Sequence, residues 1–314
     1  MTRHLLDLAE LSTSDLLEII DLARVPAGHE LSQQSVAMFF EKPSGRTRNA
    51  TEMAVVDLGG HPVMITQGEV GIDTRESAED VARTLGSFHR ILAARVNDHG
   101  VLVRMKEALS SPPWNVSVVN LLSDVSHPCQ AIADVLTMLD EFGDGRSMSA
   151  LHGKRLCYVG DANNVTLSLA QASLQLGIDV RIAAPQGYQF SSEVLDDLAD
   201  LGASAGASVL QTSDLAEAAD NADVLYSDVW TSMGQEAEHD QRLNDLSGYG
   251  IDAALLAYAN PDAVVLHCLP AHRGEEITDE VLEGPQSRIW QQVAHRRTAM
   301  RGVFRWLLSD GEGS

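Results

Sequence analysis

The chain has 314 residues, 44% of them hydrophobic, and its 45 acidic and 22 basic side chains give a formal net charge of −23. A field of this sign repels nucleic acid and anionic membranes, which excludes a general role in binding either. The length predicts two domains of ordinary size, and no apolar run approaches the roughly 18 residues that a membrane-spanning helix needs.

The acid excess is accompanied by only three lysines: Lys42, Lys106 and Lys154. Concentrated salt screens self-repulsion, and an acidic, lysine-poor protein stays soluble there, so we hypothesise a halophilic source. A high-GC genome that favours arginine over lysine would produce a similar ratio. The three cysteines are far apart in the sequence, which is typical neither of a disulfide framework nor of a metal site.

The first elements along the chain indicate a parallel sheet. Residues 1–20 predict an amphipathic helix rich in Asp and Glu, unlike a signal peptide, and therefore a cytoplasmic protein. Apolar runs then predict strands that alternate with helical patterns. The strands are expected at 35–40, 62–66, 90–96 and 117–122, and the helices at 47–60, 76–88 and 128–143.

A Gly- and Ser-rich segment, 143–153, interrupts this rhythm, and a second series follows. Its strands are expected at 154–160, 179–185, 222–228 and 263–270, with helices at 164–177 and 193–203. The sequence thus predicts an α/β protein of two domains, each a parallel β-sheet flanked by helices on both faces and linked by helices. We expect the first domain at 1–134 and the second at 135–290. A long helix is expected over 289–308, and the C-terminal segment 291–314 is expected to pack back on the first domain.

Open parallel sheets bind ligands at the carboxyl ends of their strands, and polar residues follow six of the eight predicted strands. These stretches are Ser44–Arg48, Arg95, His127–Gln130, Asp161–Asn164, Asp228–Gly234 and His267–Gly274.

Ser44, Gly45, Arg46 and Thr47 lie where a strand turns into a helix. A helix N-terminus offers free N–H groups and partial positive charge, hydroxyls add donors, and arginine adds a forked cation, so this turn predicts a phosphate site. An ordinary capped helix with exposed arginines is the alternative.

His127 and Gln130 open a second helix behind Pro128. A histidine here could donate to a carbonyl oxygen on which negative charge develops, while the glutamine binds a neighbouring amide. A histidine that only caps the helix is the alternative.

The later strand ends carry neutral and acidic groups. The stretch GDANNV lacks the glycine fingerprint of a dinucleotide site. Its asparagines could bind a carboxylate or form an Asx turn, and Asp228 could hold an ammonium group or belong to a structural loop. Because neighbouring strand residues point to opposite faces, His267 is badly placed to activate Cys268, whose thiol is better suited to contact a substrate amine.

Five stretches in this order, FEKPSGRTR, HPCQ, GDANNV, DVWTSMGQE and HCLPAHRG, resemble the ornithine carbamoyltransferase family, over about residues 35–308. HCLP and the Asp-x-x-x-Ser-Met-Gly pattern favour the ornithine branch over the aspartate branch. The resemblance implies carbamoyl transfer from carbamoyl phosphate to the δ-amine of L-ornithine, giving L-citrulline. It also implies a homotrimer or multiple of trimers, with no metal and no organic cofactor.

The resemblance also implies roles for single residues. Arg95, His127, Asp228 and Cys268 would be catalytic. Carbamoyl phosphate would be bound by Ser44, Gly45, Arg46, Thr47, Arg95, His127, Gln130 and Arg296. L-Ornithine would be bound by Asn164, Asp228, Ser232, Met233, Cys268 and Leu269.

Two departures from the family pattern stand out. Gly45 replaces a usual threonine, and its N–H remains available. Gly71-Ile72-Asp73 replaces a usual Gln-Leu-Gly, which removes an amide donor and brings an acid near a phosphate. A carbamoyltransferase for another amine such as putrescine, a non-catalytic family member and a nucleotide-binding oxidoreductase are the alternatives. The implied reaction could serve either arginine synthesis or citrulline breakdown.

Overall fold

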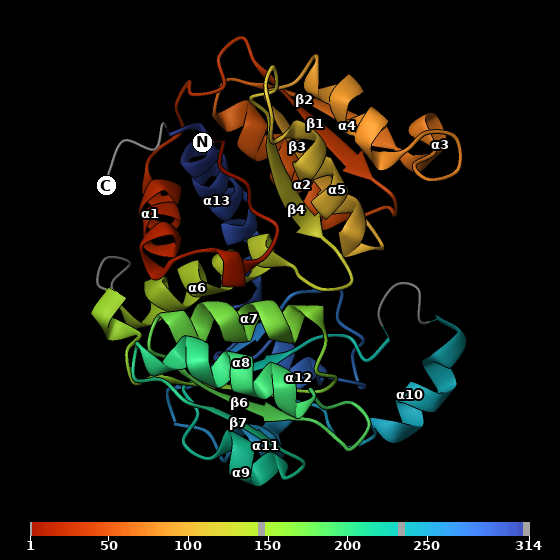
Figure 1. Ribbon diagram of the computed structural model, residues 1–314. Coiled ribbons are helices and arrows are strands. Elements are labelled where there is room, and N and C mark those ends of the chain that lie inside the picture. The colour runs from red at the N-terminus through yellow and green to blue at the C-terminus, as the bar shows by residue number, and fades with distance from the viewer. Residues whose placement is uncertain (1, 144–147, 232–235, 310–314) are drawn as a thin grey trace. The chain divides into compact units, whose positions relative to one another are not determined.

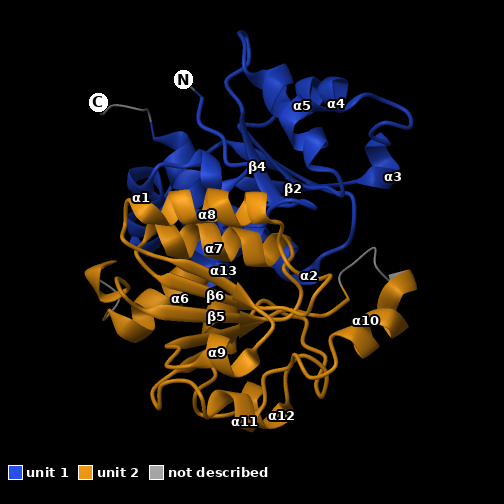
Figure 2. Cartoon of the chain, turned by 60° about the horizontal axis from the view of Figure 1, so that its bottom comes forward, with its two compact units in different colours: residues 1–133, 294–314 blue, residues 134–293 orange. Residues whose placement is uncertain are grey.

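The computed structural model describes residues 2–143, 148–231 and 236–309 (Figure 1). The chain forms two compact units, residues 1–133 with 294–314 and residues 134–293 (Figure 2). It passes from one unit to the other within α6 (Pro128–Phe142) and again within α13 (Ile289–Leu308).

The sheet of unit 1 is parallel, with strand order β2-β1-β3-β4. The strands are β1 Ser35–Phe40, β2 His61–Thr66, β3 Ile91–Arg95 and β4 Ser117–Leu122. The helices within this unit are α1 Thr13–Arg24, α2 Gly45–Asp57, α3 Gln67–Val70, α4 Ala78–Gly86 and α5 His99–Leu109, with a 3-10 turn at Leu8–Glu10. Since the order reverses between β1 and β3, the carboxyl ends of these two strands form the switch point at which such sheets bind ligands.

Alternate residues of the central strands show why both faces of this sheet are covered. Ala37 and Phe39 of β1 belong to one apolar cluster with buried residues of α4 and α5. Val36 and Met38, which point to the other face, are also fully buried. This near-continuous burial is the pattern expected of a parallel strand between two helical layers.

The sheet of unit 2 is also parallel, in the order β7-β6-β5-β8-β9. Its strands are β5 Arg155–Val159, β6 Asp179–Ala183, β7 Val209–Thr212, β8 Val224–Ser227 and β9 Val264–His267. The helices are α7 Asn164–Gln175, α8 Ser192–Ala203, α9 Leu215–Ala219, α10 His239–Asp245, α11 Ala253–Leu256 and α12 Asp279–Leu282, with 3-10 turns at Met148–Ala150 and Glu236–Glu238. Here the order reverses between β5 and β8.

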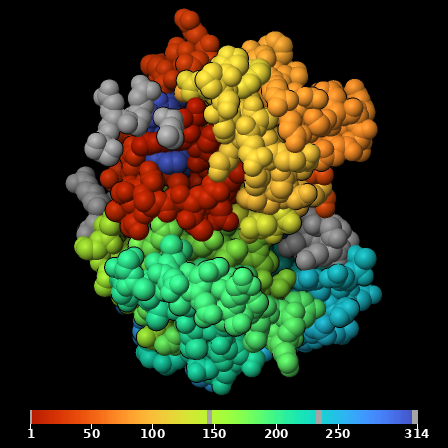
Figure 3. Space-filling model, in the orientation of Figure 1, coloured from red at the N-terminus to blue at the C-terminus, as the bar shows by residue number. Residues whose placement is uncertain are grey.

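Helices lie on both sides of the second sheet. Figure 1 shows α7 and α8 on one side and α9 and α11 on the other. Most of α8 is accessible to solvent, and it forms part of the green surface in Figure 3. The two helix-flanked parallel sheets confirm the predicted α/β fold. No helix in the described part of the chain combines the length and apolar character needed to cross a membrane.

The N-terminal prediction was wrong in its bounds. Instead of a helix over 1–20, Leu5 bridges to Val119 beside β4, and α1 begins only at Thr13. Ser12 and Asp15 form a capping box that starts the helix there. Burying the apolar side chains of Leu5 and Leu6 against the sheet outweighs the helical pattern of the first residues.

Several further elements were not predicted: β7, α5 and the short helices α3, α9, α10, α11 and α12. β7 is an edge strand of mixed polarity whose residues are partly exposed, so it lacks a clear apolar signal. α5 lies in the segment between the predicted strands at 90–96 and 117–122, to which no element was assigned.

The end of α13 packs within unit 1. Gly302 approaches the Ile19 carbonyl of α1, and a Cβ added there would lie 2.7 Å from the Ala23 Cβ. Arg297 and Arg301 pair with Asp57 at the end of α2, Arg297 Nε lying 2.7 Å from Asp57 Oδ2. Close backbone approach and ion pairs thus join the last helix to α1 and α2.

We predict that Gly302→Ala lowers the free energy of unfolding, because the methyl group collides with the α1 backbone at a cost of about 1–3 kcal/mol. This outcome opposes helix propensity, which favours alanine over glycine by about 1 kcal/mol. Gly68→Ala in α3 is the matched control, since its nearest neighbour would be 4.0 Å away. Denaturant unfolding measures both variants, and equal stability of Gly302→Ala and wild type would contradict the packing.

Candidate active site

The switch point of unit 1 carries the predicted phosphate loop. Ser44 is the N-cap of α2, and its Oγ accepts from Thr47 N at 3.4 Å. Gly45 begins the helix, with open space where a Cβ would point. The two arginines of this turn differ: Arg48 Nε pairs with Glu52 one turn along α2 at 2.8 Å, whereas Arg46 lies close enough to Arg95 to lower its pKa.

Cationic groups from distant segments gather around this helix end. Arg95, the last residue of β3, is 6% exposed, and burial, followed by repulsion from Arg296 and Arg46, lowers its pKa to about 10. Arg296 of α13 is buried and donates to Thr47 Oγ1 at 2.7 Å. This crowding of guanidinium groups costs free energy that a bound dianion would offset.

His127, just before α6, belongs to the same cluster and is fully enclosed. Burial first, and then the charges of Arg296 and Arg95, hold the pKa of His127 well below its usual value of 6.5. The imidazole is therefore neutral at physiological pH, and it can donate one hydrogen bond without adding to the positive charge. Gln130, in the first turn of α6, is also buried.

The switch point of unit 2 centres on Asp228, which follows β8 and is 6% exposed. Its Oδ1 accepts from the Cys268 thiol and from Val229 N, each at 2.8 Å. Its Oδ2 accepts from Asn163 Nδ2 at 3.2 Å. The carboxylate thus accepts three hydrogen bonds. The donors come from the residue after β9, from the residue that follows Asp228 and from the turn after β5.

For Asn163, one of the two asparagines of GDANNV, a carboxylate ligand and an Asx turn were the alternatives, and a contact with Asp228 was not predicted. Asn163 is the N-cap of α7, where its Oδ1 accepts from Val165 N and Thr166 N while its Nδ2 reaches Asp228. An Asn-Asn pair at a strand-to-helix turn signals a cap, but the contact with Asp228 depends on the order of the strands. Asn164, the predicted ligand, is the first residue of α7, and its Oδ1 accepts from Val165 N at 3.0 Å.

At the end of β9 the side chains of His267 and Cys268 have different partners, as the alternation of side chains along a strand predicts. His267 Nε2 lies 3.1 Å from Glu276 Oε1, and its Nδ1 accepts from Leu269 N at 2.9 Å. Leu269 has a φ of +61° and is partly buried. Ser232 and Met233, also predicted to bind substrate, lie outside the described residues.

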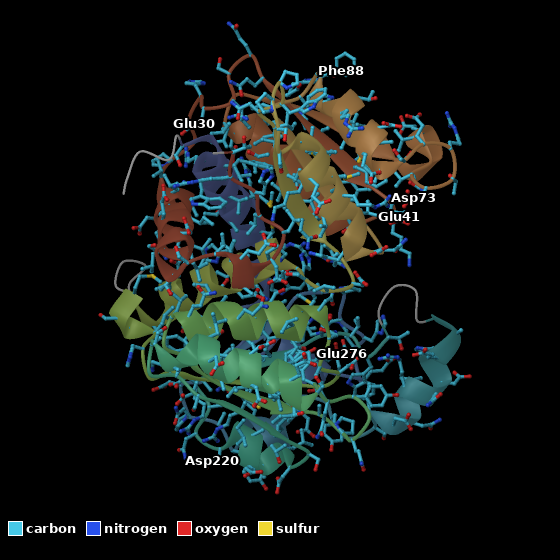
Figure 4. The ribbon with its side chains drawn as sticks, in the orientation of Figure 1. Glu30, Glu41, Asp73, Phe88, Asp220 and Glu276 are labelled. Carbon is cyan, nitrogen blue, oxygen red and sulfur yellow. The ribbon has the colours of Figure 1, made fainter. Side chains whose placement is uncertain are left out.

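Asp73 has a partner that was not predicted. The resemblance suggested an acid near a phosphate, and the structure shows that Arg104 of α5 pairs with it, Arg104 Nη1 lying 3.1 Å from Asp73 Oδ1. Figure 4 labels Asp73 on the loop between α3 and α4. Hydrogen bonding to Arg104 holds the pKa of Asp73 below its usual value. The negative charge of Asp73 is therefore offset by Arg104.

One group in the described chain has the composition of a metal site. His272, Glu275 and Glu276 each place a ligand-type atom within 4.8 Å of the others. Glu276 Oε1 already accepts from His267 Nε2 and from His272 N, and His272 lies 3.3 Å from Glu275. Hydrogen bonds and ion pairing within this turn account for the grouping.

Comparison with known proteins places the whole chain among carbamoyltransferases. The family described as aspartate/ornithine carbamoyltransferase matches through its carbamoyl-P binding domain at residues 3–140 and its Asp/Orn binding domain at residues 152–307. A protein named ornithine carbamoyltransferase from Acidothermus cellulolyticus is 42% identical over 319 residues, covering 100% of this chain and 99% of the relative. One from Methanoculleus marisnigri is 41% identical over 302 residues, covering 96% and 93%.

A solved structure is similar over the same length. The ornithine carbamoyltransferase from Pyrococcus furiosus superposes with a TM-score of 0.89 at 36% identity, covering 96% of each chain.

We predict that His127 makes stability fall in mild acid. The unfolded chain binds a proton at this histidine near pH 6.5, whereas the folded protein does so only at much lower pH. The free energy of unfolding is therefore complete above pH 6.5 and falls below it, by up to about 1.4 kcal/mol per pH unit from this group. Denaturant unfolding between pH 7 and 5 should give a shallower slope for His127→Gln than for wild type. Parallel slopes would show that the imidazole is not held neutral.

Proposed function

The chain belongs to the aspartate/ornithine carbamoyltransferase family, and we propose that it transfers the carbamoyl group of carbamoyl phosphate to the δ-amine of L-ornithine, giving L-citrulline and phosphate. The observation that supports this most strongly is the buried cluster in unit 1, where Arg95 and Arg296 surround a neutral His127 at the end of a helix dipole. Such a cluster suits a ligand that joins a phosphate dianion to a polarisable carbonyl group.

Carbamoyl phosphate would bind at the start of α2. Ser44, Gly45 and Thr47 offer N–H and hydroxyl groups to the phosphate, and Arg46 offers its charge. Arg95 and His127 would donate to the carbamoyl oxygen, and Gln130 would hold the carbamoyl amide. Arg296, already bonded to Thr47, would complete the cradle.

L-Ornithine would bind to residues of unit 2. Asp228, fixed by Asn163 and Cys268, would hold the amino end of the substrate, with Asn164 at its carboxylate. Ser232, Met233 and Leu269 would contribute further contacts. A plain diamine such as putrescine has no α-amino acid end for these groups to recognise, which favours ornithine.

The reaction would proceed by direct attack of the neutral δ-amine on the carbamoyl carbon. Charge that develops on the carbamoyl oxygen meets donors already in place, so little reorganisation is needed. The carbon–nitrogen bond forms, the bond to the phosphate oxygen breaks, and phosphate departs among the arginines. The attacking nitrogen gives up one proton, with the departing phosphate or the Asp228–Cys268 pair as its acceptor. Positioning and electrostatics would supply most of the acceleration, without a covalent enzyme intermediate.

The finer parts of the proposal rest on the family resemblance and the composition. We propose residues 1–134 with 291–314 as the carbamoyl-phosphate domain and 135–290 as the ornithine domain. The end of the first family domain at residue 140 supports the boundary near 135. The compact unit that joins 294–314 to 1–133 supports the place of the last helix, although the second family domain extends to residue 307. From the resemblance we also propose a homotrimer or a multiple of trimers, and from the N-terminal sequence a cytoplasmic enzyme. The net charge of −23 is the observation that motivates adaptation to high salt.

The deciding assay measures citrulline formation from carbamoyl phosphate and L-ornithine in low and in molar potassium chloride, with putrescine in parallel. We expect ornithine turnover, higher in molar salt because screening reduces acid–acid repulsion. Turnover of putrescine alone would assign the other substrate. A folded protein that turns over neither at any salt would be the non-catalytic alternative, and equal activity at both salts would remove the halophilic hypothesis.

Two neighbouring arginines provide a matched test of the phosphate loop. Arg46→Gln should lower kcat/KM for carbamoyl phosphate by about a hundredfold, in line with the loss of one preorganised donor to developing charge. Arg48→Gln should change it by less than about threefold, because Arg48 makes an exposed pair with Glu52. Steady-state kinetics at constant ionic strength measures both, and equal losses would reject the assignment of Arg46.

A further inference from the structure

A buried polar network in unit 2 links the elements that carry the candidate site residues. Its centre is Asp134 of α6, which is fully buried. Asp134 Oδ2 accepts from Tyr226 Oη at 3.1 Å, and Asp134 Oδ1 accepts from Gln292 Nε2 at 2.7 Å. Gln292 Oε1 in turn accepts from His267 N at 2.9 Å. Helices α6 and α13 are thereby bonded to strands β8 and β9.

Each residue of the network lies within one helical turn or two strand residues of a candidate site residue in the sequence. On α6, Asp134 is one helical turn after Gln130, and on α13, Gln292 is one turn before Arg296, so each pair shares a helix face. On the strands, Tyr226 is two residues before Asp228, and the amide of His267 directly precedes Cys268. The network therefore lies on two helices that carry Gln130 and Arg296 and on two strands that lead directly to Asp228 and Cys268.

The protonation of Tyr226 suits this role. Burial, and then the nearby charge of Asp134, hold the pKa of Tyr226 well above its usual value. The phenol therefore keeps its proton and remains a donor to the carboxylate across the physiological range. Tyr226 also stacks on Tyr158 of β5, with ring centroids 5.9 Å apart, which fixes the direction in which the hydroxyl points.

We propose that Asp134, Tyr226 and Gln292 form a positioning network that sets the register of α6 and α13 on the ends of β8 and β9. None of the three touches substrate in this proposal; they act through the elements that do. A buried carboxylate with fixed donors has one low-energy arrangement, so the network selects a single register where apolar packing alone would tolerate several. The kinetic consequence of this inference rests on the proposed function.

The kinetic test compares Tyr226→Phe and Gln292→Met with a matched control, Tyr158→Phe. The control removes the same hydroxyl from the stacked neighbour, whose oxygen lies outside the network. Tyr226→Phe and Gln292→Met should lower kcat by about ten- to a hundredfold, as expected when reacting groups are misplaced by a fraction of an ångström. The KM values for carbamoyl phosphate and ornithine should change by less than about threefold, and Tyr158→Phe should retain kcat within about twofold.

Melting temperature and far-UV circular dichroism, measured on all variants, separate loss of fold from loss of alignment. Unchanged kcat in Tyr226→Phe, or an equal loss in Tyr158→Phe, would reduce the network to a stability element and overturn the proposal.

Hydrogen exchange tests the network without catalysis. In Gln292→Met, amide exchange should rise together in peptides covering 128–134 and 263–270, because both segments lose a partner; in Tyr158→Phe neither should change. A rise confined to 263–270 would reject the link between helices and strands. If the wild-type protein turned over neither amine, the proposed function would fail, and the exchange result alone would decide the network.

Discussion

The burial of guanidinium groups close to one another is the constraint that shapes the candidate site of unit 1. Burial, followed by the charges of Arg296 and Arg46, lowers the pKa of Arg95. Burial, followed by the charges of Arg296 and Arg95, lowers the pKa of His127 and keeps its imidazole neutral. Such a cluster persists only if the surrounding structure holds it in place. The ion pairs of α13 with Asp57, and its close contact with α1, supply that hold.

The same cluster explains how a protein with a net charge of −23 can bind an anionic substrate. The global field repels a dianion, so attraction must be local and within a Debye length. Permanently charged arginine suits this purpose better than lysine, because its fork matches phosphate oxygens. Asp73, the acid in the 71–77 loop, is paired with Arg104 of the same unit. The positive charge of Arg104 offsets the repulsion that Asp73 would exert on a phosphate.

In unit 2 the constraint is the burial of the Asp228 carboxyl group, which requires hydrogen-bond donors around it. Asp228 accepts from a thiol, an amide side chain and a backbone N–H, and this distributes its charge over neutral donors. The second buried carboxylate, Asp134, is satisfied by a phenol and an amide in the same way. Neutral donors thus satisfy both buried carboxyl groups, and Asp228 is the one that we propose to hold the substrate ammonium group.

The sequence by itself determined what is decided over a few residues. The central strands, the cap at Ser44 and the start of α6 at Pro128 follow from apolar periodicity and capping chemistry, and these were predicted within a few residues. The order of the motifs also carried the family resemblance. The weakly patterned edge strand β7 and the N-terminal segment were not predictable, because partner strands rather than local preference hold them.

Tertiary structure alone decided which distant residues meet. Thr47 and Arg296, 249 positions apart, are joined because α13 packs on α1 and α2. Asn163 reaches Asp228 because β5 and β8 are neighbours in the sheet, and Asp73 meets Arg104 because α5 lies beside α4. Asp134 and Gln292 meet across 158 positions for the same reason. Strand order and helix packing, which no local pattern encodes, turn separate polar residues into a site.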